Sequence, residues 1–319
     1  SKRPQVAVSK GPTLHVLLLV LNSGSSSLKF QLFDMPDSSV VLKGSVDRIG
    51  EEDAEVSIGG VTKRVEVADH TAALAQVEGA LKNAGHEAIE AIGHRVVHGG
   101  DLYGDAIVVN ASVEADIESL AALAPLHNPP NLEGIRAARR AFPDARHVAV
   151  FDSAFHQTLP PKAYLYAIPY DLYETHRIRR YGFHGTSHRY VSIRAAQLLG
   201  KNTFTGITCH LGNGCSIAAI RDGKSVDVSM GLTPLEGVAM GTRSGDLDPS
   251  VVIHIQKRLG LSFDEVDNLL NRESGLLGLT GLSNDLREIE AAVDRGDSRA
   301  VVALDLFAYR IQKYIGAYV

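Results

Sequence analysis

Two segments of the sequence, residues 16–33 and 205–221, share one layout that strongly constrains the fold. Each segment consists of an apolar run, a turn of small residues and a second apolar run, and the turns read Asn-Ser-Gly-Ser-Ser-Ser and Gly-Asn-Gly. Short apolar runs bounded by such turn residues are typical of β-strands. A shift of 188 positions aligns Gly24 with Gly212. The repeat predicts two related α/β domains, each of which begins with a β-hairpin.

The rest of the chain alternates strand-like runs with helix-like runs, as α/β proteins do. Further strands are predicted at 40–46, 55–67, 89–98 and 147–151, and helices at 71–84, 112–123, 131–141, 187–199, 249–259, 285–294 and 298–315. The predicted helix N-caps are Asn131, Asp248, Ser262 with Glu265 in a capping box, Ser283 or Asn284, and Ser298. We expect a flexible N-terminal tail at 1–13, a first domain at 14–153 and a second domain at 154–319.

Charge and composition exclude several classes of function. The formal net charge is −5 and no Lys/Arg-rich tract is present, so no nucleic acid partner is expected. No apolar run approaches the roughly 18 residues of a membrane span. The apolar run near the start is broken by His15 and is short for a signal peptide. Two cysteines, Cys209 and Cys215, do not make a disulfide framework, and a cytoplasmic location is expected.

The serine-rich turn of the first hairpin has the chemistry of a phosphate-binding loop. Gly24, Ser25 and Ser27 combine little bulk with N–H and O–H donors, and Lys29 adds a positive charge. Asn22 can reach a phosphate oxygen or a metal-bound water. The second turn, at 212–214, is the other candidate cradle. A serine-rich surface turn and an ordinary Asn-Gly hairpin turn are the alternatives.

Three further motifs carry groups suited to anionic chemistry. Arg95 and Val97 share one face of a predicted strand, which suits a carboxylate with a short apolar tail, although a structural salt bridge is the alternative. Asp152 ends a buried strand and can hold Mg²⁺. His184 and Arg243 lie in glycine-flanked loops, where each can stabilise developing charge. His184 lacks the neighbouring glutamate of a zinc-binding HExxH motif.

One further motif-like stretch and one further histidine are not assigned to a functional site. The stretch Gly223-Lys224-Ser225 lacks the first glycine of a P-loop, because position 218 is alanine. The histidine at 188 is expected to be a core or capping residue, in contrast to His184.

Six ordered motifs together resemble the acetate kinase family, of the acetate and sugar kinase/Hsp70/actin superfamily. They are VLNSGSSSLK at 20–29, GHRVVHGG at 93–100, LHNPPN at 126–131, YGFHGTSH at 181–188, HLGNGCSI at 210–217 and GTRSGDLDP at 241–249. The resemblance runs from about Leu17 to Tyr318. It implies two ribonuclease H-like domains, the second of which lacks its C-terminal part.

The resemblance also implies site residues. The implied catalytic residues are Arg95, Asp152, His184 and Arg243. The implied pocket for the substrate methyl group and carboxylate consists of Arg95, Val97, Leu126, Phe183 and Pro234. The implied nucleotide and phosphate ligands are Ser25, Ser27, Lys29, His210, Gly212, Asn213, Gly214, Asn284, Asp285 and Arg287. The implied ligands of Mg²⁺ (or Mn²⁺) are Asn22 and Asp152.

The implied reaction is reversible in-line transfer of the ATP γ-phosphoryl group to acetate, giving acetyl phosphate and ADP, by a cytoplasmic homodimer. A propionate- or butyrate-type kinase is the near alternative. The resemblance further implies a glycine-rich adenosine loop, a glutamate near Mg²⁺ and a final segment after the last helix, and this sequence ends before them. We therefore expect a truncated chain, for which a nucleotide-binding fragment without turnover is the second alternative.

Overall fold

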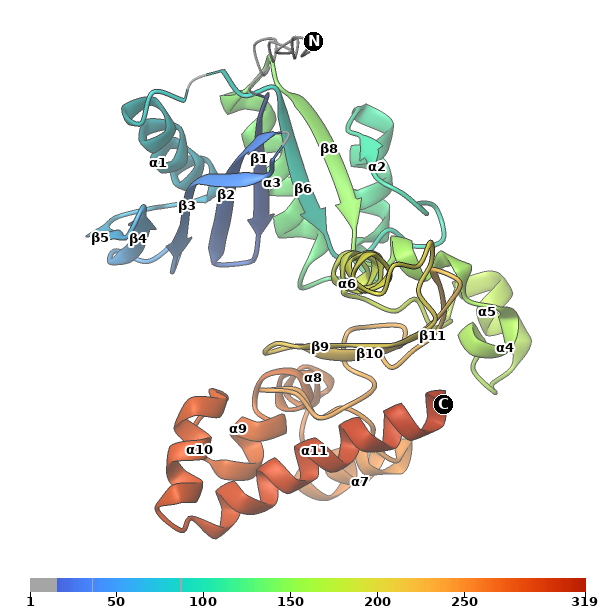
Figure 1. Cartoon of the computed structure of the whole chain (residues 1–319). Helices are drawn as coiled ribbons and strands as arrows, with labels where there is room; N and C mark the ends of the chain where they lie inside the picture. Colours follow the sequence, from blue (N-terminus) through green and yellow to red (C-terminus); the bar gives the residue numbers. More distant parts are fainter. Residues whose placement is uncertain (1–15, 36, 87) are drawn as a thin grey trace, which may run out of the picture. The chain divides into compact units, whose positions relative to one another are not determined.

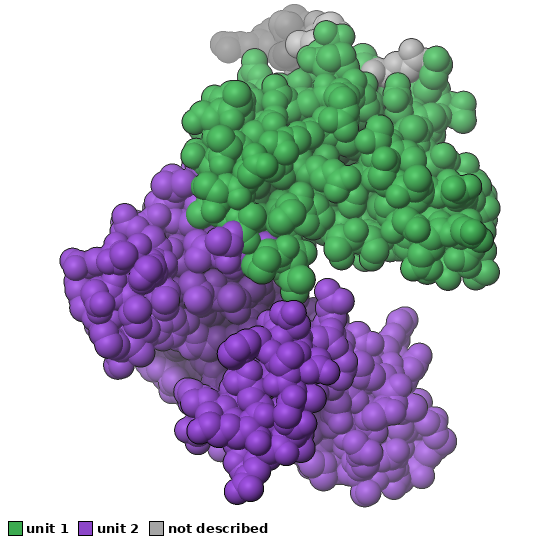
Figure 2. Space-filling view, turned by 180° about the vertical axis from the view of Figure 1, so that it is seen from behind, with its two compact units in different colours: residues 1–96, 107–121, 125–150 green, residues 97–106, 122–124, 151–319 purple. Residues whose placement is uncertain are grey.

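The computed structural model describes residues 16–35, 37–86 and 88–319. The chain divides into two compact units, shown in Figure 2. Unit 1 comprises residues up to 96 together with 107–121 and 125–150, and unit 2 comprises 97–106, 122–124 and 151–319. Each unit has its own sheet and its own core (Figure 1). The N-terminal tail predicted at 1–13 lies outside the described residues.

In the described residues, the sheet of unit 1 has eight strands in the order β5-β4-β3-β2-β1-β6-β8-β7. They are β1 (Val16–Ser23), β2 (Ser27–Met35), β3 (Ser39–Asp47), β4 (Ala54–Ile58), β5 (Val61–Val65), β6 (Ala91–Val96), β7 (Ile107–Val108) and β8 (Arg146–Phe151). Strands β1 to β5 pair antiparallel, whereas β1 and β6 pair in parallel. The helices are α1 (His70–Asn83), α2 (Ala111–Ser119), which continues into a 3-10 turn (Leu120–Ala122), and α3 (Asn128–Ala141).

Alternating residues build the core of unit 1. In β2, Leu28, Phe30 and Leu32 are buried, while Lys29 and Gln31 between them are exposed. The period of two sends successive side chains to opposite faces of a strand. The apolar face packs with α1 and α3 into one cluster, and the polar side chains of Lys29 and Gln31 are exposed on the other face.

In the described residues of unit 2, the sheet has three antiparallel strands, β9 (Gly206–Leu211), β10 (Cys215–Arg221) and β11 (Lys224–Val228). Helix α6 (Gly185–Leu198) contacts β9, and α11 (Ser298–Tyr318) contacts β10 from the opposite face (Figure 1). The other helices are η2 (Ala154–Thr158), α4 (Pro161–Tyr164), α5 (Tyr170–His176), α7 (Pro249–Leu259), α8 (Phe263–Arg272), α9 (Gly275–Thr280) and α10 (Leu286–Asp294).

Both hairpins predicted from the internal repeat are present. Strands β1 and β2 pair through the serine-rich turn, and β9 and β10 pair through the Gly-Asn-Gly turn. The rejected P-loop candidate is the tight turn between β10 and β11, where Asp222 and Gly223 have positive φ angles. The short helices α4, α5 and α9 were not predicted, because four to seven residues carry too little periodicity to detect.

Two of the predicted N-caps are confirmed and three are wrong. Asp248 caps α7, and Ser262 forms the capping box with Glu265. Helix α3 starts at Asn128, three residues earlier than expected, and Asn131 is buried inside it. Helix α10 is capped by Asp285 and α11 by Asp297, each one residue beside the predicted cap. In both cases the side chain of a neighbouring aspartate accepts from the backbone N–H groups of the first turn.

Across 16–35, 37–86 and 88–319, no helix combines the length and the apolar character needed to cross a membrane.

Candidate active site

The serine-rich turn of unit 1 is held in place by helices behind it. The Gly24 N–H donates to the Ser27 carbonyl at 2.7 Å and closes the turn. His70 Nε2 lies 2.7 Å from the Gly24 carbonyl, and Asn131 Nδ2 donates to the Ser23 carbonyl at 2.6 Å. These contacts take up carbonyl groups of the turn, and Ser25 at its tip is exposed, so its hydroxyl can reach a ligand.

Close packing explains why α3 can support this turn. A Cβ atom on Gly134 would lie 2.1 Å from Ser23 Oγ, so only glycine lets the helix approach so closely. The sequence analysis did not single out His70 or Gly134, and it assigned Asn131 a different role. Asn131 was predicted to cap the helix at 131–141, whereas its amide donates to the Ser23 carbonyl of β1.

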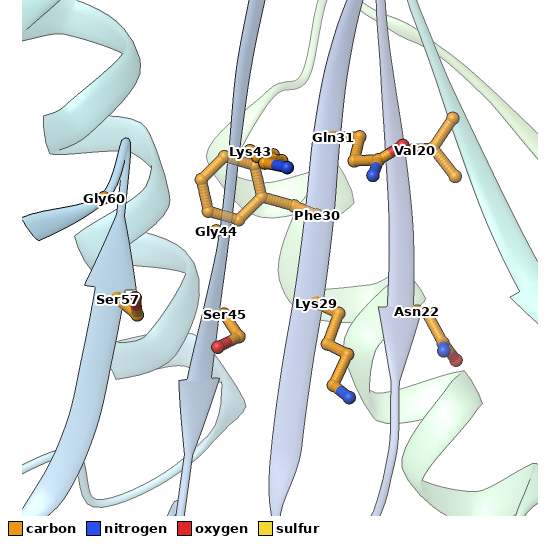
Figure 3. A pocket seen from close by; sticks show the side chains of 10 residues that line it. All are labelled: Val20, Asn22, Lys29, Phe30, Gln31, Lys43, Gly44, Ser45, Ser57 and Gly60. Carbon is orange, nitrogen blue, oxygen red and sulfur yellow. The ribbon is translucent and has the colours of Figure 1, made fainter. Parts of the chain in front are cut away.

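Three of the predicted ligands form a row across neighbouring strands of unit 1. Asn22 in β1 is directly opposite Lys29 in β2, and Arg95 Nη1 in β6 lies 3.4 Å from Asn22 Oδ1. Asn22 and Lys29 line one end of an open hollow of about 530 Å³ on the polar face of the sheet (Figure 3). Ser45 lies in the same hollow. The structure therefore brings together two cations and an amide on one sheet face.

His184 is fixed in unit 2 by several contacts. It precedes α6 with a left-handed φ of 57°. Its Nδ1 lies 2.9 Å from Ser216 Oγ, and its ring stacks on His210 at 4.1 Å between centroids. His210 Nδ1 in turn lies 2.9 Å from Ser187 Oγ. The two imidazoles, which sequence analysis assigned to separate motifs, thus form one stacked pair.

Asp152 and the start of α6 are adjacent. The Gly185 N–H donates to the Asp152 carbonyl at 2.8 Å, and a Cβ on Gly185 would lie 2.3 Å from that oxygen. Glycine is required here by close approach. Asp152 itself is buried, directly after β8. The contact places the residue that follows His184 against the backbone of Asp152.

Arg243 and His184 meet at the second Gly-rich turn. A Cβ on Gly214 would lie 3.2 Å from Arg243 Nη1 and 3.3 Å from His184 Nε2. Arg243 Nη1 also donates to the Pro234 carbonyl at 3.1 Å. The turn, the imidazole and the guanidinium therefore converge, which is the arrangement needed to neutralise an anion held over the turn.

The predicted nucleotide ligands at 284–287 lie beside the same turn through one contact. Asn284 Nδ2 donates to Asn213 Oδ1 at 2.7 Å. The Gly241 N–H donates to the Asn213 carbonyl at 2.9 Å, so the turn is also joined to the loop before Arg243. Arg287 is fully exposed and its guanidinium folds back on Asp285, which lowers the pKa of that carboxyl to about 2.

The predicted apolar wall residues are brought together in part. Val97 and Phe183 are buried in one cluster of unit 2, with Tyr181, Met230 and Met240. Pro234 reaches the site through its carbonyl, as described above. Leu126 is 40% exposed and belongs to unit 1.

A buried histidine supports the backbone beside His184. His156 is fully buried, its Nε2 lies 3.0 Å from the Phe183 carbonyl, and its Nδ1 lies 2.8 Å from Ser225 Oγ. A carbonyl only accepts, so Nε2 carries a proton. Burial lowers the pKa of His156 to about 4. His188, predicted to be a core or capping residue, is indeed buried between Thr208 and Ser216, with a pKa lowered to about 2.

We expect the free energy of unfolding to fall as the pH drops from about 6.5 towards 4. In this window the unfolded chain protonates its histidines while His156 in the folded chain stays neutral, so protons favour unfolding, by about 2 kcal/mol for His156 at pH 5. Denaturant unfolding at pH 7.5 and 5.0 measures the slope. His156→Gln should reduce the slope and exposed His254→Gln should leave it unchanged; equal slopes for the two variants would contradict the prediction.

A network around Arg180 was missed by the sequence analysis. Arg180 Nη1 donates to the carbonyls of 228, 229 and 230 at 3.0–3.1 Å, and its Nη2 contacts Glu236 Oε1 at 2.5 Å. Tyr166 Oη donates to Glu236 Oε2 at 2.5 Å. This network anchors the loop that carries Pro234, the residue whose carbonyl holds Arg243. No local sequence pattern pairs residues 56 positions apart.

Within the described residues, no group of three or more His, Cys, Asp or Glu side chains is arranged to hold a metal ion.

Comparison with known proteins identifies close relatives. The model of the Acetokinase family matches residues 17–319. The chain is 52% identical over 314 residues to the acetate kinase of Natranaerobius thermophilus, covering 94% of this chain and 79% of that relative. It is also 52% identical over 311 residues to the acetate kinase of Bacillus cytotoxicus, covering 94% and 78%.

Solved structures agree with these matches. A propionate kinase from Francisella tularensis superposes with a TM-score of 0.93 at 46% identity, covering 95% of this chain and 80% of that chain. The acetate kinase of Porphyromonas gingivalis gives a TM-score of 0.89 at 45% identity, covering 95% and 79%. The mixed α/β fold and the resemblance predicted from six motifs are confirmed, and the chain belongs to the acetokinase family.

Proposed function

We propose that this chain transfers the γ-phosphoryl group of ATP to acetate, reversibly, giving acetyl phosphate and ADP. The observation that carries the proposal is the convergence of Arg243 and His184 on the glycine turn at 214, in a chain 52% identical to acetate kinases. A carboxylate acceptor needs no strong base. Catalysis is then mainly alignment of two anions and neutralisation of charge, for which guanidinium and imidazole donors are suited.

We assign roles by the chemistry of each side chain. Arg95 forks onto the acetate carboxylate, and Arg243 neutralises the transferring phosphoryl group. His184 donates to the oxygens on which charge develops. Val97, Phe183, Leu126 and Pro234 enclose the methyl group.

The nucleotide contacts follow the same logic. Ser25, Ser27 and Lys29 in unit 1, and His210 with the turn at 212–214 in unit 2, bind phosphate oxygens. Asn284, Asp285 and Arg287 lie at the adenosine.

We propose that Asp152 of unit 2 and Asn22 of unit 1 each contribute a ligand group to a magnesium ion. Mg²⁺ takes one or two protein carboxylates and completes its coordination with phosphate oxygens and water. Asp152 offers a buried carboxylate at a strand end, and Asn22 offers an amide oxygen beside the phosphate turn. When bound, Mg²⁺ (or Mn²⁺) would neutralise phosphate charge.

We propose that the two units correspond to the two ribonuclease H-like domains at 14–153 and 154–319. We further propose a cytoplasmic homodimer.

Formation of acetyl phosphate, trapped as its hydroxamate, tests the function with ATP, Mg²⁺ and acetate. Propionate is the second substrate to test, because one methylene is worth about 0.8 kcal/mol of burial and the two acids are expected to overlap. The 46% identity to a propionate kinase makes that comparison worthwhile. If the chain binds ATP but forms no hydroxamate from either acid, the result would contradict the kinase proposal and favour a nucleotide-binding module without turnover.

We expect Arg95→Ala to raise the KM for acetate at least tenfold, because a bidentate contact to the carboxylate is lost. Steady-state kinetics at saturating ATP measures the change. Arg64→Ala, an exposed arginine of the same unit, is the matched control. A KM for acetate equal to that of the parent would remove Arg95 from the pocket.

A further inference from the structure

A second cationic site lies in unit 1, away from the serine-rich turn. A hollow of about 570 Å³ forms where the last turns of α3 meet β7, β8 and α2. We call it the basic hollow. Its charged and titratable lining consists of Arg136, Arg139, Arg140, Arg146, His147 and Glu114.

The basic hollow has more guanidinium groups than carboxylates around it. Arg136, Arg139 and Arg140 have i, i+3, i+4 spacing on α3, which places like charges on one helix face at a cost in stability. Glu114 bonds Arg139 and lies 3.1 Å from Arg136 Nε, and Glu118 lies 3.1 Å from Arg136 Nη2. Two carboxylates therefore face four guanidinium groups, counting Arg146 on β8.

These ion pairs also orient the arginine side chains that line the hollow. Glu114 is only 14% exposed and holds two guanidinium groups that are 42% and 40% exposed. Each guanidinium has five N–H donors in a planar fork, and the contacts to Glu114 and Glu118 use few of them. Arg140 donates to Thr71 Oγ1 at 3.2 Å through a single Nη2. Guanidinium N–H groups therefore remain around the hollow, and their planar geometry matches the oxygens of phosphate and carboxylate groups.

The imidazole of His147 lines the basic hollow and is held by two contacts. Its Nε2 lies 3.0 Å from the Phe142 carbonyl, and its Nδ1 lies 2.9 Å from His94 Nε2. Burial, together with the charge of Arg139, lowers the pKa of His147. An anion beside Arg139 would offset that charge and raise the pKa of His147. The NMR signals of the His147 imidazole should therefore change when an anion binds in the basic hollow.

The basic hollow is separated from the predicted phosphate ligands of the same unit. The Arg146 N–H donates to the Glu90 carbonyl just before β6, whereas Arg95 lies near the other end of β6. Five residues of strand correspond to about 16 Å. Arg139 and Arg140 also complement the dipole at the C-terminus of α3, but this accounts for neither Arg146 on β8 nor Arg136 one turn earlier.

We propose that the basic hollow is a second binding site, for a small multivalent oxyanion. The chemistry is shared by phosphorylated metabolites and polycarboxylates. The ligand places its oxygens between the guanidinium groups of α3 and that of Arg146, against apolar walls formed by Val108 and Pro143.

Pyrophosphate and citrate are the probes, each titrated into the full chain while the His147 imidazole signals are followed by NMR. The test variant is the double substitution Arg140→Gln with Arg146→Gln, which leaves the Glu114 ion pairs intact. Arg64→Gln with Arg194→Gln removes the same charge from exposed positions and is the matched control. Calorimetry separates this site from the serine-rich turn, because Lys29→Gln should weaken only the latter.

In the parent and the control, we expect the His147 signals to shift with pyrophosphate or citrate. In the test variant, we expect the affinity reported by His147 to fall at least tenfold. A stronger response to pyrophosphate indicates a phosphorylated ligand, and a stronger response to citrate indicates a polycarboxylate. No shift in the parent with either probe, or the same affinity in the test variant, would overturn the proposal whatever the kinase assay shows.

Discussion

Arg243→Ala is expected to lower kcat about 10³-fold, the low end of what an arginine contributes to phosphoryl transfer. The guanidinium stands beside Gly214 and the imidazole of His184, where a phosphoryl group over the turn would lie. Its charge is most needed when negative charge is shared among entering, leaving and equatorial oxygens. Loss of the side chain should therefore affect kcat more than the KM for ATP.

Arg243→Lys distinguishes charge from geometry. Lysine keeps a point charge but loses the fork, so partial recovery of kcat is expected. Arg194→Ala, on the exposed face of α6, is the control for loss of an arginine. Because Arg243 also bonds the Pro234 carbonyl, the melting temperature of each variant must be measured. A folded Arg243→Ala protein with the parent's kcat would exclude Arg243 from the transition state.

The second large effect concerns stability. Arg180→Met is expected to lower the free energy of unfolding by about 3 kcal/mol, the low end of the usual cost of breaking a buried ion pair from one side, because Arg180 and Glu236 are only partly buried. Arg180 is 16% exposed and serves three carbonyls as well as Glu236. Removing it takes this donor from the three carbonyls and leaves the Glu236 carboxylate without its positively charged partner, with Tyr166 Oη still donating to it. Urea unfolding of the parent and the variant measures the loss.

A double variant makes this prediction sharper. Adding Glu236→Gln to Arg180→Met removes the uncompensated charge, so the pair should lose less stability than the sum of the two single variants. Arg194→Met is the exposed control, with an expected change within about 0.5 kcal/mol. A loss below about 1 kcal/mol in Arg180→Met would contradict the role of the network.

The Arg180 network also bears on activity. A Cβ on Gly231 would lie 1.8 Å from Glu236 Oε2, so the carboxylate packs directly on the loop backbone. Pro234 lies between these two residues, and its carbonyl holds Arg243. A destabilised network should therefore displace Arg243 and lower kcat in addition to stability.

Local sequence patterns predicted the elements well wherever the signal was itself local. The two hairpins, the capping box at Ser262 and the start of α7 each depend on residues a few positions apart, and all are confirmed. The caps of α10 and α11 were placed one residue away from Asp285 and Asp297. Several polar residues adjoin each helix start, and backbone geometry chooses among them.

The sequence by itself determined the α/β fold, the two hairpin turns and the family, because strand alternation, glycine-containing turns and ordered motifs are all local features of the chain. Only the tertiary structure decided what supports them. Asn131 under the serine-rich turn, Arg180 bonded to Glu236, and Arg146 beside the arginines of α3 are contacts between elements distant in sequence. Such contacts depend on which helix face meets which strand, and packing of the whole unit sets that choice.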